Sequence, residues 1–456
     1  MASPKSLVME PAFDVDKLSY EIFSILESKF LFGYDDPKLF LSAGSLPNTP
    51  PKTPARSAAA ASGGRVRVLS IDGGGRAADS LIAAAALVRL ECSLRMRSGD
   101  PASRIADFFD VAAGSGAGGV LAAMLFARGP QGRPLFSAEE AMAFLAGNIH
   151  RKRWSGGRRW LFRRSGGVYH KVFGEMTLRD MLKPVLIPCY DLSTRGLFLF
   201  SRADAVESEG FDFLMRDVCT ATCAGGEEAV EMRSVDGKRR IAAVGGGVAL
   251  GNPTAAAITH VLNNKHEFPL AAGVEDLLVV SIGAGEAVHG VSHGSTPSAA
   301  EIARIAAEGA ADMVDQAVAM AFGHNRTSNY LRIQGNLSVF GGGRNLSKED
   351  KKKVMKVAEE MLLQRNVESI LFRGKKLAEQ TNGEKLEWFA HELMTEHERR
   401  KTSPLPMVII KHAMTPRLSS ATTSTVTTTV TSSTTVTTSP SPSHSALAGR
   451  VLTAML

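Results

Sequence analysis

The sequence predicts an α/β fold with a largely parallel central sheet flanked by helices. Between residues 65 and 412, short apolar runs alternate with segments of helical periodicity, and this alternation is typical of βαβ units. Several of the apolar runs end directly in glycine clusters. Ligand sites in such sheets lie at the carboxyl ends of the strands. We therefore expect the glycine clusters to form the functional end of this domain.

The predicted elements follow one another in a regular order. A first strand, RVRVLSI at 65–71, ends in DGGG and is followed by a helix over 80–94. The run ADFFDVAAG at 106–114 predicts a second strand, which passes through GSGAGG into a helix over 120–127. Further strands are predicted to end within LFLFSRADA at 197–205, RRIAAVGGG at 239–247 and DLLVVSIGAG at 276–285.

The segments on either side of this domain differ from it in composition. Residues 1–42 contain one amphipathic stretch, 14–30, and predict an N-terminal helical segment. Residues 43–64 are rich in Pro, Ala, Ser and Gly and indicate a linker. Residues 413–456 are rich in Ser and Thr and carry too few large apolar side chains for a core, so we expect a disordered tail.

Composition points to an intracellular, cytoplasmic protein with a core. The chain has 456 residues, of which 44% are hydrophobic. Its four scattered cysteines suit neither a disulfide framework nor a zinc site, so we expect buried reduced thiols at Cys92, Cys189, Cys219 and Cys223. The N-terminus shows no secretory signal, and no apolar run reaches about 18 residues. Any membrane association is therefore expected to be peripheral.

One segment, residues 150–167, concentrates positive charge and tryptophan without any acid. Attraction to lipid headgroups with interfacial Trp anchoring would explain this mixture, as would an ordinary solvated loop or a contact with nucleic-acid phosphates. Because no nucleic-acid recognition motif accompanies the segment, membrane lipids are the expected partner and nucleic acid is not. The predicted membrane patch comprises Arg151, Lys152, Arg153, Trp154, Arg158, Arg159, Trp160, Arg163 and Arg164.

The glycine cluster GSGAGG allows more than one reading. Gly114, Gly116 and Gly119 satisfy the G-x-G-x-x-G spacing of dinucleotide-binding turns. That motif also needs an acid on the next strand, whereas Glu139 and Glu140 lie in a segment that looks helical. A phosphate-binding P-loop is disfavoured because no Gly-Lys-Ser/Thr follows either glycine cluster.

Acyl-transfer chemistry accounts for both glycine clusters together. One loop must offer backbone N–H groups to an oxyanion, and Gly73, Gly74 and Gly75 suit a close backbone approach. A sharp strand-to-helix turn must present a nucleophile beside that loop, and GSGAGG has the build of such a G-x-S-x-G elbow. The apex of this elbow, however, is Gly116.

Successive blocks of the sequence resemble the patatin-like lipid acyl hydrolases, and they come in that family's order. The similarity covers most of 65–412 and looks closest to the plant group III patatin-related branch. The blocks are IDGGG at 71–75, FDVAAGSGAGG at 109–119, SRADAVES at 201–208, CTATCA at 219–224 and VGGGVALGNPTAAAITHV at 244–261, with AADMVDQAVAMAFG and VESILFRGKKLAEQ pointing to the branch.

The resemblance implies a Ser–Asp dyad that forms an acyl-enzyme, and it implies which positions belong to the site. The family's serine falls on Gly116, and its aspartate falls on Gly245, so glycine occupies both positions. The implied oxyanion hole comprises Gly73, Gly74, Gly75 and Arg76, although Arg76 follows the glycines one place earlier than in the family pattern. Gly114, Gly118 and Gly119 complete the implied elbow.

Three other side chains are candidate substitutes for the dyad. Ser115 precedes the apex, so its side chain is expected to point away from the attack direction. Cys223 is expected to be a buried helical thiol, and Asp236 to form a turn between strands. HELMTEH at 391–397 lacks the second histidine of a zincin helix, and His289 and His293 read as loop residues. No metal or cofactor is expected.

The sequence therefore predicts a lipid acyl hydrolase for phospholipid and galactolipid esters, with weak or unconventional catalysis. Because both dyad positions are glycine, a noncatalytic lipid-binding or regulatory protein is the alternative. A nucleotide-dependent enzyme is a third and more distant hypothesis. The sequence gives no indication of the oligomeric state.

Overall fold

The structure, a computed structural model, confirms the predicted fold class. It describes residues 64–73, 77–148, 166–224, 229–283, 298–334, 356, 359–370 and 374–411. These form one eight-stranded sheet, in the order β5-β6-β3-β2-β1-β7-β8 with β4 beside β3, and a separate two-stranded hairpin. The predicted N-terminal helical segment, the linker up to residue 63 and the Ser/Thr-rich tail lie outside the described residues, so these domain assignments stay predictions.

The centre of the sheet is parallel. β1 (Val66–Ile71) lies between β2 (Val111–Gly114) and β7 (Leu277–Ile282), with β3 (Val185–Asp191) beyond β2 and β8 (Tyr330–Ile333) beyond β7. All four pairs run parallel. Because all five strands point the same way, their carboxyl ends meet at one edge, where the two glycine clusters lie.

The sheet continues on one side with strands that run antiparallel. β4 (Gly196–Ser201) and β6 (Arg240–Val244) both pair with β3, and β5 (Val230–Arg233) pairs with β6. The sequence predicts strands near 197–205 and 239–247 but does not show their direction. Only residues 192–195 separate β3 from β4, and so short a connection returns a strand antiparallel, since a parallel neighbour needs a long crossover.

Two local predictions were wrong. The run 106–114 is not a single strand: α4 (Ile105–Phe108) precedes β2, because the Asp107 carboxylate accepts a 2.8 Å hydrogen bond from the backbone N–H of Arg104 and caps this short helix. Cys92 is exposed on α3, whereas the other three cysteines are buried as expected.

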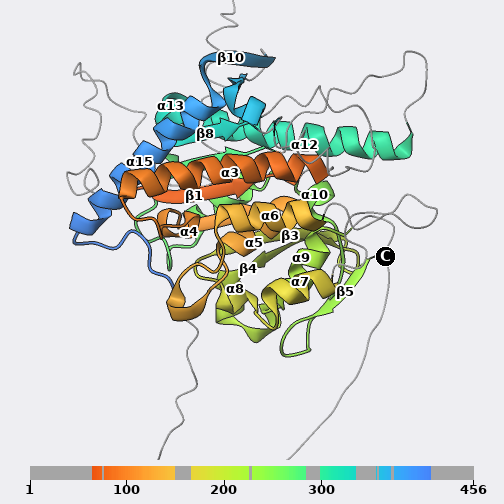
Figure 1. Cartoon of the computed structure of the whole chain (residues 1–456). Helices are drawn as coiled ribbons and strands as arrows, with labels where there is room; N and C mark the ends of the chain where they lie inside the picture. Colours follow the sequence, from red (N-terminus) through yellow and green to blue (C-terminus); the bar gives the residue numbers. More distant parts are fainter. Residues whose placement is uncertain are drawn as a thin grey trace, which may run out of the picture. The chain divides into compact units, whose positions relative to one another are not determined.

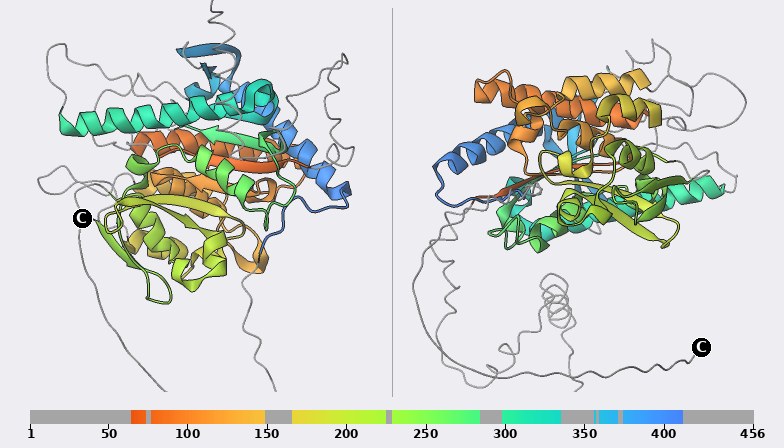
Figure 2. Two further views of the ribbon diagram at one scale, coloured as in Figure 1. Left: turned by 180° about the vertical axis from the view of Figure 1, so that it is seen from behind. Right: turned by 90° about the horizontal axis from the view of Figure 1, so that it is seen from below.

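Helices cover both faces of the sheet (Figure 1; Figure 2). Leu69 and Ile71 of β1 pack with α3 (Ala77–Ser98), α5 (Gly116–Leu125), α6 (Ala138–Asn148) and α9 (Met215–Thr222). Val66 and Val68 point to the opposite face, against α11 (Thr254–Asn263) and α12 (Ala299–Phe322). The alternation along β1 therefore builds two cores from one strand.

The remaining elements connect and extend these layers. The helices are α7 (Gly166–Phe173), α8 (Arg202–Glu207), α10 (Gly246–Ala249), α13 (Arg326–Asn329) and α15 (Asn382–Thr402), and the hairpin is β9 (Arg365–Ile370) with β10 (Gly374–Thr381). Single 3₁₀ turns lie at Pro130–Gly132, Leu178–Asp180, Glu209–Phe211, Val274–Asp276 and Gly323–Asn325. Within the described ranges, no helix is long and apolar enough to cross a membrane.

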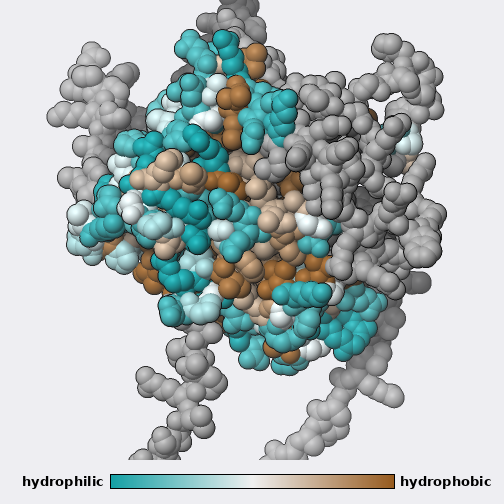
Figure 3. Space-filling model, in the orientation of Figure 1, coloured by the Kyte–Doolittle hydropathy of each residue, from teal (hydrophilic) through white to brown (hydrophobic). Residues whose placement is uncertain are grey.

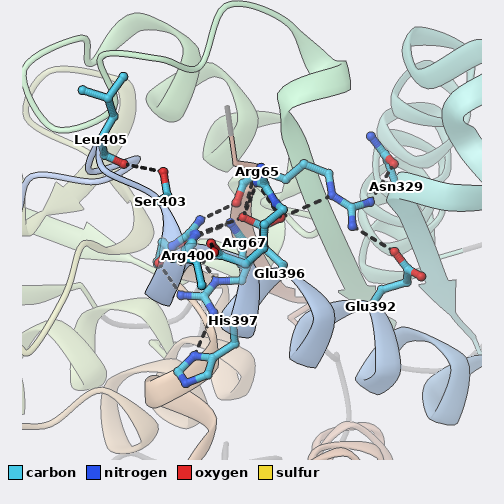
Figure 4. Close-up of polar contacts among 12 residues, drawn as sticks. Arg65, Arg67, Asn329, Glu392, Glu396, His397, Arg400, Ser403 and Leu405 are labelled. Carbon is cyan, nitrogen blue, oxygen red and sulfur yellow. Dashed lines mark hydrogen bonds and ion pairs between the residues drawn. The ribbon is translucent and has the colours of Figure 1, made fainter. Parts of the chain in front are cut away.

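An ion cluster joins the start of β1 to α15 at the amino edge of the sheet (Figure 4). Asp110 accepts from Arg67 at 3.0 Å and from Arg400 at 2.8 Å, and Glu396 accepts from the backbone N–H of Arg65 at 2.9 Å and from Arg400. We call these five residues the amino-edge cluster. The HELMTEH motif thus lies on a helix that serves packing, and no potential metal-binding group of three or more His, Cys, Asp or Glu occurs among the described residues.

Candidate functional site

A sharp turn joins β2 to α5 at the carboxyl edge of the sheet. Gly116 adopts φ +52°, in the left-handed region, and its backbone N–H donates a 2.9 Å hydrogen bond to Oγ1 of Thr222. A Cβ atom placed on Gly116 would lie 3.6 Å from Cα of Gly73 and 3.9 Å from the carbonyl oxygen of Thr222. Both are ordinary van der Waals distances. The apex therefore has room for a Cβ atom, which would face the first glycine loop.

The other glycines of the turn are required by close backbone packing. A Cβ on Gly114 would lie 2.3 Å from the carbonyl oxygen of Gly118, and a Cβ on Gly118 would lie 2.5 Å from those of Ile71 and Asp72. Real Cβ atoms do not approach backbone oxygens so closely, so only glycine fits. The turn is thus held against the end of β1, where the N–H of Ser115 also donates to the carbonyl of Ile71 at 3.1 Å.

The first glycine loop contacts two other glycine segments at the same edge. The N–H of Gly73 donates to the carbonyl of Gly251 at 2.9 Å, and a Cβ on Gly73 would lie 3.2 Å from Cα of Gly247 and 3.0 Å from Oγ of Ser115. Residues 73, 116 and 247 therefore lie together, as expected for one site. The other predicted oxyanion residues, Gly74, Gly75 and Arg76, lie outside the described residues.

The two implied dyad positions face the same carbonyl group. A Cβ on Gly245 would lie 3.5 Å from the carbonyl oxygen of Thr222, the atom that also faces Gly116. Unlike the apex, however, Gly245 has no space for a side chain, because its Cβ would lie 2.3 Å from the carbonyl oxygen of Ala224. The two positions implied for the dyad therefore lie on either side of one carbonyl group, and only Gly116 has room for a Cβ atom.

Ser115, which precedes the apex in the chain, has no base hydrogen-bonded to it in the described part of the chain. Its side chain is buried, and its Oγ makes no hydrogen bond to any described residue. A serine needs a neighbouring proton acceptor to attack an ester. The geometry gives Ser115 a place at the site without a means of activation.

The other two candidate substitutes, Cys223 and Asp236, lie in surroundings that suit structural roles. Cys223 is buried at the end of α9, and burial raises the pKa of its thiol to about 12, so it stays protonated at neutral pH. Asp236 lies in the turn between β5 and β6, as predicted, where it accepts from Oγ of Ser234 at 2.6 Å and from the N–H of Lys238 at 3.1 Å.

A buried polar cluster lies beneath the first glycine loop. Asp72, directly after β1, accepts a 2.6 Å hydrogen bond from Arg332 of β8, which also donates to Oγ of Ser281 at 2.7 Å. Tyr330 donates to Asp315 of α12 at 2.6 Å. Although burial opposes it, the charges of Asp72 and Asp315 raise the pKa of Arg332 above its usual range. Sequence reasoning missed Arg332; the one signal was an arginine within the otherwise apolar strand YLRI.

A second network positions the segment that holds Gly251. Thr254 is fully buried, and its Oγ1 lies 2.6 Å from Asn252 Oδ1, 2.8 Å from Ser70 Oγ and 2.9 Å from Ser281 Oγ. The side-chain amide of Asn252 donates to the carbonyl of Ala311 in α12 at 3.3 Å. The strand ends, the glycine loop and α12 are therefore connected through buried hydrogen bonds.

Together, fold and site define an α/β protein with a hydrolase-type strand–turn–helix elbow whose apex is glycine. The chain is 60% identical to "Patatin-like protein 3" of rice over 395 residues, covering 85% of this chain and 92% of the relative. It is 49% identical to "Patatin-like protein 7" of Arabidopsis thaliana, covering 89% and 86%, and 38% identical to "Probable inactive patatin-like protein 9" of the same plant, covering 84% and 93%. The chain belongs to the plant patatin-like protein family.

Two further comparisons add little to this assignment. No family model matches the sequence. Among solved structures, the chain is similar to VipD from Legionella pneumophila, with 12% identity, a TM-score of 0.28 and coverage of 65% of this chain and 66% of that one.

The nine residues of the predicted membrane patch, Arg151 to Arg164, lie outside the described residues, so this prediction stays open.

Proposed function

We propose that this chain binds acyl lipids at the elbow and hydrolyses phospholipid and galactolipid esters slowly. The observation that carries the proposal is the space at Gly116, which faces Gly73 at the N-terminus of α5. Resemblance to the lipid acyl hydrolases supplies the substrate class. The methyl-sized space at the apex suits a water molecule where the family's serine side chain would stand.

In this proposal water replaces the serine as nucleophile. Its oxygen attacks the ester carbonyl carbon, and the charge that develops on the carbonyl oxygen is stabilised by the positive N-terminal end of α5. The ester C–O bond then breaks, and the proton released by the attacking water passes through solvent to the departing alkoxide. Loss of a nucleophile costs on the order of 10⁶ in turnover, whereas binding and an oxyanion site leave roughly 10³–10⁴ over water.

The alternative function is lipid binding without turnover. It is favoured by one specific observation, the lack of room for an aspartate at Gly245, because a base cannot be restored there without movement of the Ala224 backbone. The name of one relative, "Probable inactive patatin-like protein 9", is in keeping with this alternative.

Peripheral membrane association forms part of the proposal. The basic, tryptophan-containing segment 150–167 lies in the sequence between α6 and the start of α7. Figure 3 shows apolar surface in the region of these two helices. Both helices carry half-buried apolar side chains, Met142 and Phe144 on α6 and Val172 on α7. Apolar surface beside a basic segment is the combination that binds anionic bilayer surfaces.

The test is release of free fatty acid from phosphatidylcholine and monogalactosyl lipid vesicles. Four proteins are compared: the parent, Ser115→Ala, Gly116→Leu and Gly116→Ala. Leucine fills the apex, whereas alanine imposes the same backbone strain with little volume, so the Leu and Ala variants form a matched pair. We expect slow release by the parent, unchanged release by Ser115→Ala, and loss in Gly116→Leu well beyond that in Gly116→Ala.

Each other outcome selects a different function. Loss of release in Ser115→Ala would make Ser115 the nucleophile and would contradict attack by water. No release by the parent, together with vesicle binding that Gly116→Leu weakens, would establish the lipid-binding alternative. Release that is unaffected by Gly116→Leu would place the chemistry elsewhere and would overturn the proposal.

A further inference from the structure

The outward face of α12 is apolar along its whole length. In an ordinary surface helix the apolar stripe faces the core and polar residues face water. In α12 the buried residues Asp315, Val318 and Phe322 face the body, whereas an exposed uncharged stripe recurs at spacings of three and four residues on the opposite side. We call it the α12 stripe: Ile302, Ala306, Gly309, Met313, Ala317 and Met320.

The large apolar side chains of the α12 stripe are more than half exposed to solvent. Ile302 is 56% exposed, Met313 is 62% exposed and Met320 is 54% exposed, and Ile305 lies exposed at the edge of the stripe. The acidic residues Glu301, Glu308 and Asp312 follow a different side of the helix, because they are out of phase with this spacing. An uncharged surface of this length indicates a partner.

The α12 stripe lies at the functional end of the molecule. The body-facing side of α12 lies close to Gly251, whose carbonyl holds the first glycine loop: a Cβ on Gly251 would lie 3.6 Å from Cβ of Ala311. The carbonyl of Ala311 also accepts the hydrogen bond from Asn252. Figure 1 shows the N-terminal part of α12 reaching past the adjacent ends of α3 and α10. A partner bound to the stripe would therefore lie about one helix diameter, roughly 10 Å, from the site.

From these observations we infer that the α12 stripe docks the protein on the neutral surface of a lipid bilayer. The inference rests on the proposed function, because an acyl lipid in a bilayer must reach the elbow from the membrane surface. A second copy of the chain fits less well. The stripe, from Ile302 to Met320, is roughly 27 Å long and about 10 Å wide, so pairing two copies through it buries on the order of 500 Å², below the ~1,200 Å² of stable interfaces.

The chemistry of α12 specifies the kind of surface. The stripe offers only apolar and small residues, and its flank is acidic, so binding draws on burial of apolar side chains and not on attraction to anionic headgroups. Docking through α12 should therefore tolerate salt and favour zwitterionic or uncharged lipids. Because α6 and α12 cover opposite faces of the sheet, docking through α12 is an alternative to docking through the surface over α6 and α7. Binding that depends on the basic segment 150–167 would weaken in salt.

The test measures partitioning of the full chain onto vesicles of pure phosphatidylcholine at low and high salt. The variant combines Ile302→Asn, Ile305→Asn and Met313→Gln. The control is Met96→Gln, because Met96 is about as exposed as Met313 and lies near the C-terminus of α3. We expect a roughly tenfold or larger loss of partitioning in the variant at both salt concentrations, and none in the control. Unchanged partitioning of the variant would overturn the inference.

Three further measurements distinguish docking through the α12 stripe from dimerisation and from the proposed hydrolysis. A polarity-sensitive fluorophore on Met313→Cys, in a Cys92→Ser background, should shift to the blue on phosphatidylcholine vesicles; no shift would contradict docking. Sedimentation showing a dimer that the triple variant abolishes would instead assign the stripe to a second copy. Hydrolysis of a water-soluble ester tests the proposed function alone, since it needs no lipid surface and should be equal in parent and triple variant.

Discussion

Oδ2 of Asp72 accepts a 2.6 Å hydrogen bond from Arg332, and both side chains are buried where β1 passes into the first glycine loop. This pair joins the central strand to β8, near one edge of the sheet, from beneath the site. It fixes the point from which Gly73 extends toward the elbow. The position of the loop therefore depends on a buried charge pair, and removal of one partner should have a large effect.

We expect Arg332→Met to lower the free energy of unfolding by about 3–5 kcal/mol, because it leaves the buried carboxylate of Asp72 without its counter-charge. Urea unfolding followed by circular dichroism measures this loss. Adding Asp72→Asn to Arg332→Met should recover part of it, since the uncompensated charge is then removed. A loss below about 0.5 kcal/mol for the single variant would show that the pair does not hold the loop.

The glycines of the elbow predict a graded response to alanine. Gly118→Ala should be severely destabilising, by roughly 3 kcal/mol or more, because its Cβ would lie 2.5 Å from two backbone oxygens. Gly147→Ala, in α6 with nothing within 4 Å of its Cβ, should be neutral or stabilising by up to about 1 kcal/mol. Thermal unfolding of the two variants provides the comparison, and equal melting temperatures would refute the packing argument.

Restoring the two family residues should succeed at one position only. Gly116→Ser should fold, at a strain cost of about 1–2 kcal/mol for φ +52°, but without a base at position 245 it should not raise ester hydrolysis above that of the parent. Gly245→Asp should be much less stable because of the Ala224 carbonyl oxygen 2.3 Å from its Cβ. Hydrolysis of a soluble chromogenic ester and melting temperature are the two readouts. A stable Gly245→Asp protein would show that the backbone at Ala224 moves at little energetic cost and would contradict this prediction.

The amino-edge cluster predicts acid sensitivity. Although burial opposes it, the charges of Arg67, Arg400 and Lys183 hold the pKa of Asp110 well below its usual range. Stability from this carboxylate is therefore fully present above its unfolded pKa of about 3.9 and is lost as pH falls further toward the folded value. Asp110→Asn should be less stable than the parent at neutral pH.

Acid titration of the unfolding free energy checks this sign. The difference between the parent and Asp110→Asn should shrink as pH falls below about 4, because the parent alone loses this contribution. Glu359→Gln, which removes one carboxylate from an exposed position, is the control for net charge. A difference that stays constant down to strongly acid pH would mean that Asp110 is not held ionised by its neighbours.

Much of the architecture could be predicted because its signals are local. β1, β7 and the elbow are each bounded by glycine and carry mostly apolar runs, which is why their positions and the functional edge followed from the sequence. The direction of β4 and β6 could not be predicted in the same way, since it depends on pairing with β3. Asp107 caps α4, where the sequence predicts the start of a strand. The pattern of hydrophobic residues does not reveal such a cap.

At the site, the sequence identified the convergence of residues 73, 116 and 245 only through the family resemblance. The difference between Gly116 and Gly245 is absent from the sequence, because two glycines look alike until the neighbouring backbone is in place. Arg332 and Thr254 were missed for the same reason. Each acts through partners that lie far along the chain and become neighbours only in the folded sheet.

The hydrogen bond between Arg65 and Glu396 of α15, part of the amino-edge cluster, affects how the chain folds during synthesis. β1 is synthesised early, yet β7 follows roughly 200 residues later, which is roughly 10–40 s at ~5–20 residues per second. Glu396, which secures the start of β1, emerges later still. We expect a growing chain to keep the Val66 and Val68 face unprotected for this period and to depend on chaperones until the ribosome has passed α15.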